Sequence, residues 1–288
     1  MKIIDGKIIS TKIIDKIQKE VSIIFESKGK RPSLAIIFVG NDPASETYVS
    51  AKIKTCDRVG ILSEIYRFPN SVLEGDITGK IEELNNDSTY DGILVQLPLP
   101  SHIEQRKVLD SINPDKDVDG LSSWNIGLLV SGRPKFVPAT PLGVQKLLME
   151  SDIKIEGADI VICGRSNIVG KPLSNLLSNK NNYANATVTL CHSKTVNLID
   201  HTKRADILIV AMGIPKFVKE EMVKEGSVII DVGVNRIADD SRIKGYSIVG
   251  DVDFNSVINK VSKITPVPGG VGPMTIAMLL ENVLKSSN

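Results

Sequence analysis

Short apolar runs alternate with helix-like segments along both halves of the chain, and this alternation restricts the possible folds more than any other feature. In the first half, strands are predicted at 34–39, 62–68 and 92–96, and helices at 11–28, 43–59, 73–86 and 104–112. In the second half, strands are predicted at 159–163, 187–190, 207–211 and 228–232. Such alternation is typical of parallel sheets covered by helices. We therefore predict an α/β protein built from two α/β domains.

The boundary between the two domains is expected between Gly120 and Pro141. The pattern is less regular from Trp124 to Pro138, and 138–151 resembles a linker that enters a helix. We predict domains at 1–120 and 121–274, with an apolar C-terminal helix at 275–288 that packs back on the first domain. The polar, asparagine-rich segment SNKNNYANA is predicted to be a surface loop.

Composition excludes several classes of function. Charged residues make up 24% of the 288 residues and leave a formal charge of +1, so we expect neither nucleic acid nor a membrane surface as a partner. The three cysteines are scattered, which argues against a disulfide framework and against a zinc or other metal site. The first residues lack the apolar core of a signal peptide, and no apolar run approaches the roughly 18 residues of a membrane span. We expect a soluble, cytoplasmic protein.

The predicted helix that begins at Pro43 places polar side chains where apolar ones are expected. Asp42 is a suitable N-cap, and proline is tolerated at the first helical position. Helical spacing puts Ser45, Tyr48 and Lys52 on the face that turns inward. A buried ammonium costs several kcal/mol unless it is paired or its pKa falls, so this lysine is a candidate for chemistry or an ion pair. The alternative, equally open here, is that Lys52 extends to water along its aliphatic stem and Tyr48 is an ordinary half-buried tyrosine.

Two further polar residues, one at the end of a predicted strand and one in a predicted turn, are candidate site residues. Gln96 ends the strand in GILVQLPLP, at the sheet edge where open α/β sheets bind ligands. Asp119 precedes Gly120 in a tight turn within NPDKDVDG. On these residues alone, a capping glutamine in a loop and an ordinary surface turn remain alternatives.

The second domain opens with a strand that runs into GRSNIVGKP, residues 164–172. Gly164 permits a tight turn, Ser166 lets the backbone approach a ligand, and Gly170 lies at a helix start whose free N–H groups attract a pyrophosphate. The motif departs from G-x-G-x-x-G, because Ser166 and Val169 replace the second and third glycines. Its position between a strand and a helix nevertheless predicts a Rossmann-like, dinucleotide-binding parallel-sheet domain.

The end of the next predicted strand, CHSKT, indicates which dinucleotide binds. An NAD site usually has an acidic residue there to hold the ribose 2′-hydroxyl. Ser193 and Lys194 stand there instead, and Arg165 lies in the first loop, an arrangement suited to a 2′-phosphate. The cofactor is therefore predicted to be NADP. We assign no role to His192.

Eight motifs in order along nearly the whole chain resemble one family. YVSAK, VQLPLP, KDVDG, PATPLGV, GRSNIVGKP, CHSKT, DVGVNR and ITPVPGGVGPMT are similar to the bifunctional methylenetetrahydrofolate dehydrogenase/cyclohydrolase (FolD) family. The resemblance implies an active-site cleft between the two domains and a homodimer. It also implies NADP-dependent oxidation of 5,10-methylenetetrahydrofolate to 5,10-methenyltetrahydrofolate and hydrolysis to 10-formyltetrahydrofolate, in one-carbon metabolism and purine biosynthesis.

The resemblance also implies roles for individual residues. Lys52 would be the catalytic lysine, Tyr48 would stack on or orient the folate, Gln96 would tune Lys52, and Asp119 would hydrogen-bond the pterin. The NADP contacts would be Gly164, Arg165, Ser166, Ser193 and Val234, and the folate-site loop would contribute Pro268, Gly269, Gly272 and Thr275. The longer SNKNNYANA segment and Cys163 depart from the family pattern, and neither touches a catalytic motif.

Two rival interpretations remain. The spacing Tyr48-x-x-x-Lys52 matches the short-chain dehydrogenases, but that class has its glycine loop first and its Tyr/Lys pair far downstream in the same domain. A non-catalytic NADP-binding or folate-binding regulator on the same fold is the other possibility. The presence of Lys52, Gln96 and Asp119 argues against it, and turnover by the purified protein would decide.

Overall fold

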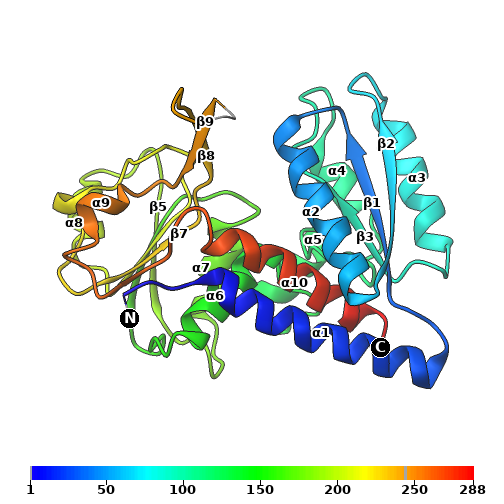
Figure 1. Cartoon of the computed structure of the whole chain (residues 1–288), viewed down its shortest axis with the longest axis horizontal. Coiled ribbons are helices and arrows are strands. Elements are labelled where there is room, and N and C mark those ends of the chain that lie inside the picture. Colours follow the sequence, from blue (N-terminus) through cyan, green and yellow to red (C-terminus); the bar gives the residue numbers. More distant parts are fainter. Residues whose placement is uncertain (1, 243–244) are drawn as a thin grey trace. The chain divides into compact units, whose positions relative to one another are not determined.

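The computed structural model describes residues 2–242 and 245–288, which form two compact units (Figure 1). The first unit consists of Thr11–Ala139 and Ile276–Asn288, and the second of the residues up to Ser10 together with Thr140–Thr275. The chain passes from the first unit to the second between Ala139 and Thr140, so residues 121–139 belong to the first unit. The division into domains at 1–120 and 121–274 stays a prediction.

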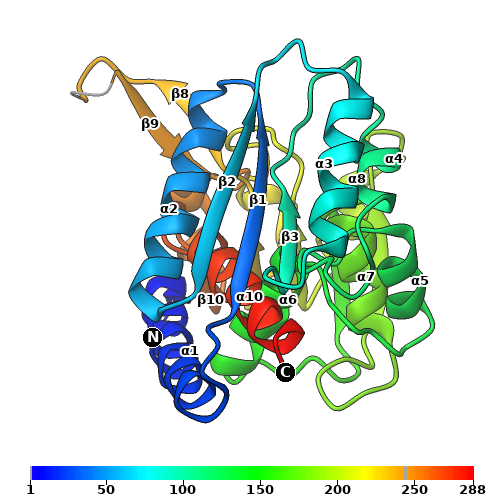
Figure 2. The same cartoon turned by 90° about the vertical axis from the view of Figure 1, so that its right-hand side faces the viewer.

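The first unit contains a parallel sheet in the order β2-β1-β3. Its strands are β1 (Ser33–Val39), β2 (Leu62–Phe68) and β3 (Gly92–Val95), and every residue of the central strand is buried. Helix α2 (Pro43–Val59) lies on one side of the sheet and α3 (Glu74–Asn86) on the other (Figure 2). Alternate residues of β1, such as Ile37, pack with Ile77 and Ile81 of α3 in one core. The predicted strands agree within one residue because buried parallel strands have nearly continuous apolar sequences.

Capping residues define the ends of the helices in this part of the chain. Asp42 Oδ2 accepts a 2.7 Å hydrogen bond from Ser45 N, and Gly60 ends α2 with a φ of 83°. Helix α1 (Gly6–Lys28) begins five residues before the predicted start. The reason is Asp5, whose carboxylate accepts hydrogen bonds from the N–H groups of Lys7 and Ile8 and so caps the first turn.

The region predicted to be irregular contains a helix. Helix α4 (Gln105–Asp110) lies within the helix predicted at 104–112, and it is followed by α5 (Ser123–Val130), which the sequence pattern does not predict. Ser122 caps α5 by accepting a hydrogen bond from Asn125 N, and Trp124 is 65% exposed. After 131–138, helix α6 (Ala139–Glu150) occupies nearly all of the segment predicted to be a linker that enters a helix, so the helix is present and begins at the start of that segment.

The second unit contains a five-stranded parallel sheet in the order β10-β7-β6-β4-β5. Its strands are β4 (Asp159–Cys163), β5 (Thr187–Cys191), β6 (Ile207–Val210), β7 (Val228–Asp231) and β10 (Lys263–Ile264). Besides α6, it contains the helices α7 (Gly170–Ser178), α8 (Leu198–Thr202), α9 (Phe254–Val257) and the 3₁₀-helix η1 (Glu220–Met222). The predicted Rossmann-like parallel sheet is therefore present.

Sequence patterns missed three short strands of this unit, β8 (Asn235–Ala238), β9 (Tyr246–Val249) and β10. An antiparallel hairpin joins β8 to β9 (Figure 1). Strand β10 has only two residues, and the chain near the N-terminus pairs with it: Ile4 N donates to Ile264 O at 2.9 Å, and Ile264 N donates to Lys2 O at 2.8 Å. The first residues of the sequence are thus part of the second unit.

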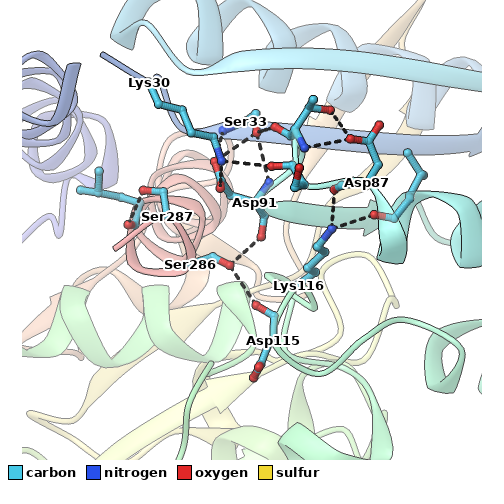
Figure 3. Close-up of polar contacts among 12 residues, drawn as sticks. Lys30, Ser33, Asp87, Asp91, Asp115, Lys116, Ser286 and Ser287 are labelled. Carbon is cyan, nitrogen blue, oxygen red and sulfur yellow. Dashed lines mark hydrogen bonds and ion pairs between the residues drawn. The ribbon is translucent and has the colours of Figure 1, made fainter. Parts of the chain in front are cut away.

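Helix α10 (Val271–Ser286) ends in the first unit. The buried Asn282 amide donates to the carbonyls of Val118 and Val137 at 2.8 and 3.0 Å. Ser286 Oγ donates to the carbonyl of Asp91 at 2.6 Å, and the Asp91 carboxylate also accepts a 2.8 Å bond from Lys30 Nζ (Figure 3). These bonds fix the last turns of α10 beside the amino end of β3.

Within the described residues, we find no helix that is both long and apolar enough to cross a membrane.

Candidate active site and cofactor pocket

Lys52 lies in the middle of α2 with its side chain turned into the first unit. Only 8% of the residue is exposed, and Val49 and Cys56, one turn to either side, are fully buried. Its Nζ donates a 2.8 Å hydrogen bond to Gln96 Oε1. The lysine therefore does not extend to water, which removes the alternative left open by the sequence.

Gln96 follows β3 and is oriented by a second hydrogen bond. Its Nε2 donates to the carbonyl of Leu97 at 2.6 Å, while its backbone N–H continues the sheet by donating to Ile37 O at 2.9 Å. Because the amide N–H is committed to Leu97, the amide oxygen points to Lys52. The side chain thus does more than cap a loop.

Asp119 is placed by a segment that runs beside β3. Ile93 N donates to Lys116 O at 2.8 Å, and a Cβ on Gly92 would lie 2.6 Å from Val118 Cγ1, so only glycine permits this approach. The buried Asp117 carboxylate then accepts N–H bonds from the far side of the turn, from Leu121 at 3.3 Å and Ser122 at 2.9 Å. The turn that carries Asp119 is therefore held by hydrogen bonds to a buried carboxylate, which an ordinary surface turn lacks.

The charges of Lys52 and Asp119 are coupled. Burial lowers the pKa of Lys52, and the neighbouring Asp119 and Cys56 oppose that change. Burial likewise raises the pKa of Asp119 to about 6, Lys52 lowers it, and Asp117 raises it further. Both groups can therefore exchange protons closer to neutral pH than exposed residues of the same type.

Tyr48 lies one turn before Lys52 and is 38% exposed, so it belongs to the rim of this site. Ser45, by contrast, is buried, with 7% of its surface exposed. The prediction that all three polar residues point inward is thus correct for Ser45 and Lys52 and only partly so for Tyr48. An aromatic ring at the rim can pack against a planar ligand.

A separate cavity of about 500 Å³ lies in the second unit at the carboxyl ends of β4, β5 and β6. It is lined by Cys163, Gly164, Arg165, Ser166, Cys191, His192, Ser193, Thr195, Leu198, Ala211, Met212, Ile214 and Phe217. This is the sheet edge at which open α/β sheets bind nucleotides. Four of the predicted NADP contacts are in its wall: Gly164, Arg165, Ser166 and Ser193.

Close backbone packing explains the two glycines of the first loop. Gly164 has a φ of +126°, and a Cβ there would lie 2.1 Å from Ala211 O. A Cβ on Gly170 would lie 1.8 Å from Gly164 O. Ser166 Oγ accepts hydrogen bonds from Val169 N at 3.1 Å and, more weakly, from Gly170 N at 3.4 Å, so this serine caps α7.

The loop after β5 carries polar and basic groups. Ser193 and Lys194 are exposed, and no carboxylate is among the residues that line the cavity. His192 Nδ1 accepts a 3.1 Å bond from Lys194 N, and Thr195 Oγ1 accepts one from His192 N, so the histidine shapes this loop. The cradle of glycines and these cationic residues fit a dinucleotide with a 2′-phosphate.

The remaining predicted site residues lie in the second unit. Val234 is 46% exposed in the turn after β7. Pro268 is exposed and Gly269 is buried in the loop before α10, whereas Gly272 and Thr275 lie in the first two turns of α10, which begins earlier than predicted. Thr275 Oγ1 lies 3.0 Å from Thr140 Oγ1. Since Lys52 is in the first unit, the predicted contribution of this loop to the same site stays a prediction.

Sequence patterns did not single out the buried polar residues that support both sites. Asp117 and Asn282 order the chain around Asp119, while Asp231 and Asp251 lie beside the cavity loops. One sequence signal for them is an acidic residue at the end of an apolar strand, as in VIID. The hydrogen-bond partners of these side chains, however, are mostly backbone groups far away in the sequence, so the pattern alone does not reveal them.

Two family models match the chain. Residues 4–119 match the catalytic domain of tetrahydrofolate dehydrogenase/cyclohydrolase, and residues 138–288 match its NAD(P)-binding domain. The chain belongs to this family. It is 53% identical to the bifunctional protein FolD of Wolinella succinogenes and 52% identical to that of Campylobacter hominis, in both cases over 100% of this chain and 97% of the relative.

Solved structures of FolD proteins agree with this assignment. The Campylobacter jejuni enzyme is 48% identical with a TM-score of 0.93, over 100% of this chain and 98% of the other. The Trypanosoma brucei FolD, solved with NADP and an inhibitor, is 38% identical with a TM-score of 0.94, over 99% of this chain and 96% of the other. The predicted family, fold class and NADP-binding domain are confirmed. This FolD-family protein is an enzyme, a methylenetetrahydrofolate dehydrogenase and methenyltetrahydrofolate cyclohydrolase.

Proposed function

We propose that the reactions of this enzyme take place at Lys52, with Gln96 and Asp119 as its partners. The observation that carries the proposal is the hydrogen bond between the buried Lys52 Nζ and Gln96 Oε1. Because burial lowers the pKa of Lys52, a larger fraction of the amine is neutral than at an exposed lysine. A neutral amine in a folate site can accept a proton.

In the dehydrogenase step, a hydride leaves the methylene carbon that bridges two folate nitrogens, and bound NADP supplies the acceptor for it. The product is the delocalised methenyl cation. The protein contributes orientation, which brings donor and acceptor to reacting distance. A nearby cation also disfavours the ammonium form of Lys52, so this step prepares the lysine for the next one.

In the cyclohydrolase step, water adds to the methenyl carbon and loses a proton. The resulting hydroxyl group then loses its proton as the formyl carbonyl forms, the bond from that carbon to one folate nitrogen breaks, and this nitrogen takes up a proton to give 10-formyltetrahydrofolate. We assign the transfer of protons between water and substrate to Lys52. Gln96 holds the amine in place through the 2.8 Å bond, while the attraction of Asp119 limits the fall in the lysine pKa.

The remaining predicted residues are assigned to binding. Asp119 is proposed to hydrogen-bond the pterin and Tyr48 to stack on it, in line with the position of Tyr48 at the rim. Pro268, Gly269, Gly272 and Thr275 are proposed to line the folate site.

NADP is proposed to contact Gly164, Arg165, Ser166, Ser193 and Val234. Arg165 and Ser193 would hold the 2′-phosphate and so favour NADP over NAD. The support for this proposal is that both residues line the cavity of the second unit, where Arg165 supplies a cationic group.

A turnover experiment tests the proposal as a whole. Purified protein receives methylenetetrahydrofolate with NADP, or with NAD in parallel, and absorbance follows the reduced cofactor and the methenyl-folate separately. We expect rapid reduction of NADP without lasting methenyl-folate, and accelerated hydrolysis of added methenyl-folate. Accumulation of methenyl-folate would contradict the hydrolytic role of Lys52, and no reduction with either cofactor would favour the binding-only alternative.

A homodimer in a reducing, cytoplasmic compartment is the proposed state of the protein. The dimer rests on the family resemblance, and light scattering of the eluted protein would test it. The compartment is supported by Cys56, Cys163 and Cys191, which are buried free thiols. Burial raises the pKa of Cys56 and of Cys163 to about 12, so neither thiol is suited to act as a nucleophile.

A further inference from the structure

Two buried aspartates in the second unit have no part in the proposed chemistry. Asp231 ends β7 with 3% of its surface exposed, and Asp251 follows β9 with none. Burial of a carboxylate is costly unless hydrogen bonds compensate for lost water. The partners of these two groups therefore indicate what the fold gains from them.

Asp251 connects two chain segments at the cofactor cavity. Its Oδ2 accepts hydrogen bonds from the N–H groups of Met212 and Gly213 at 2.6 and 2.9 Å. Its Oδ1 accepts a 2.8 Å bond from the side-chain amide of Asn235. Met212 is in the cavity wall, and Asn235 directly follows Val234, a proposed NADP contact.

Asp231 in turn holds Asp251. Its Oδ1 accepts from Gly233 N at 2.9 Å and from Asp251 N at 3.0 Å, and its Oδ2 accepts from Val252 N at 2.9 Å. Donors on either side of Val234, namely Gly233 N and the Asn235 amide, thus converge on the same carboxylate pair as the N–H groups of Asp251 and Val252.

The backbone packs closely against both carboxylates of the pair. A Cβ on Gly233 would lie 2.3 Å from Asp251 Cγ, and a Cβ on Gly250 would lie 1.8 Å from Asp231 Oδ2. Both carboxylates are thus enclosed by backbone, and a shift of either would move a loop of the cavity. Such support behind a binding surface fixes the geometry of the surface itself.

We propose that Asp251 is a positioning residue for NADP, which holds the Met212–Gly213 wall and the Val234 turn in their binding arrangement, and that Asp231 positions Asp251. Neither aspartate touches the cofactor in this account. The proposal rests on the assignment of the cavity of the second unit as the NADP site.

The test uses the fact that hydrolysis of methenyl-folate needs no cofactor chemistry. In the full-length enzyme, Asp251→Ala should raise the Kd for NADP, measured by calorimetry, and its KM about tenfold or more, because both loop N–H groups lose their hydrogen-bond acceptor. Asp251→Asn keeps one acceptor oxygen and should have a smaller effect. The KM for folate and the rate of hydrolysis should stay near those of the parent enzyme.

The control is Asp206→Ala, which removes an aspartate just before the amino end of β6, where it pairs with the exposed Lys224. It should leave NADP binding unchanged. Unchanged NADP binding in Asp251→Ala, or equal losses of both activities with an unchanged Kd, would overturn the positioning role.

If Asp251→Ala does not fold, as judged by lost hydrolysis, the decision passes to Asn235→Ala. This variant removes only the link from Asp251 to the Val234 turn, and it should raise the Kd for NADP several-fold. An unchanged Kd would overturn the proposal. Arg165→Ala distinguishes the assignment of the NADP site from the role of Asp251. If this variant also leaves NADP binding unchanged, the cavity is not the NADP site. If only Arg165→Ala weakens NADP binding, the cavity is the NADP site and the positioning role of Asp251 is rejected.

Discussion

Lys52 Nζ and Gln96 Oε1 lie 2.8 Å apart, although the two residues are 44 positions apart in the sequence. One is in the middle of α2, and the other follows β3. The bond joins a buried amine to an uncharged acceptor. An uncharged partner holds the amine without stabilising its charged form as strongly as a carboxylate would.

Gln96→Glu should therefore move the pH dependence of hydrolysis. A carboxylate at this distance favours the ammonium form, so the rising limb of the hydrolysis rate against pH should shift to higher pH by about one to three units. Gln96→Met, which removes the hydrogen bond without adding charge, should lower the rate without this upward shift. An unchanged profile in Gln96→Glu would contradict the role of Lys52 as the titrating base.

Lys52→Met should abolish hydrolysis and yet stabilise the fold at acidic pH. The folded pKa of Lys52 is below its ordinary value of 10.5, so the unfolded chain binds the proton more tightly and the buried ammonium costs stability at any pH below the folded pKa. This cost shrinks as pH rises through the folded pKa and is absent above 10.5.

Below about pH 6 the protonated Asp119 no longer attracts the ammonium, so the stability gain of Lys52→Met should be largest there. Urea denaturation from pH 5 to pH 10 measures the gain. Lys54→Met, an exposed lysine of the same helix, is the control and should change neither stability nor activity appreciably. A variant of Lys52 that retains full hydrolysis would rule out the proposed base.

Asp119→Ala should raise the KM for folate about tenfold, which is the loss expected for one charge-assisted hydrogen bond. The KM for NADP should stay unchanged, because the cofactor cavity is formed by the second unit. Steady-state kinetics with each substrate varied in turn makes the comparison. Equal rises in both constants would contradict a contact with the pterin.

Arg165→Ala combined with Ser193→Ala should reduce the preference for NADP over NAD by roughly tenfold to a hundredfold, since the 2′-phosphate loses charge-assisted bonds. The ratio of kcat/KM for the two cofactors is the quantity to measure. Lys180→Ala, an exposed lysine of the same unit, serves as the control. If the ratio does not change in the double variant, these residues do not bind the 2′-phosphate.

Asn282→Leu tests the support beneath Asp119. The variant leaves the carbonyls of Val118 and Val137 without their amide donor, which should lower the free energy of unfolding by about 1–3 kcal/mol. Because Val118 adjoins Asp119, the KM for folate should also rise. Asn288→Leu, on the exposed end of the chain, is the matched control. A loss of stability with an unchanged KM would limit Asn282 to a structural role.

The sequence predicts the parts of this fold that depend on local pattern. Buried parallel strands such as β1 are apolar throughout, and the ends of α2 carry Asp42 and Gly60, so their positions follow from simple rules. The glycine loop at Gly164 is recognisable for the same reason. Lys52 stands out because helical spacing places it on a buried face.

Other features depend on contacts that no local pattern records. Helix α5 forms where Ser122 caps it and Asn125 reaches the Asp117 carboxylate, at 2.9 Å. Strand β10 has two residues and needs the partner near the N-terminus to be recognised as a strand. Asp251 resembles any aspartate in a turn until its backbone partners, almost 40 residues earlier, are known.

The division of the chain into units also bears on its synthesis. The first unit includes Ile276–Asn288, and the second includes the residues up to Ser10. A growing chain that has left the ribosome as far as Ala139 therefore still lacks Asn282 and Ser286, which hold Val118 and Asp91. Domains usually fold in the order of their synthesis. Here the first unit cannot reach its final form until Ile276–Asn288 has also left the ribosome, so its fold is completed only after the second unit has been synthesised.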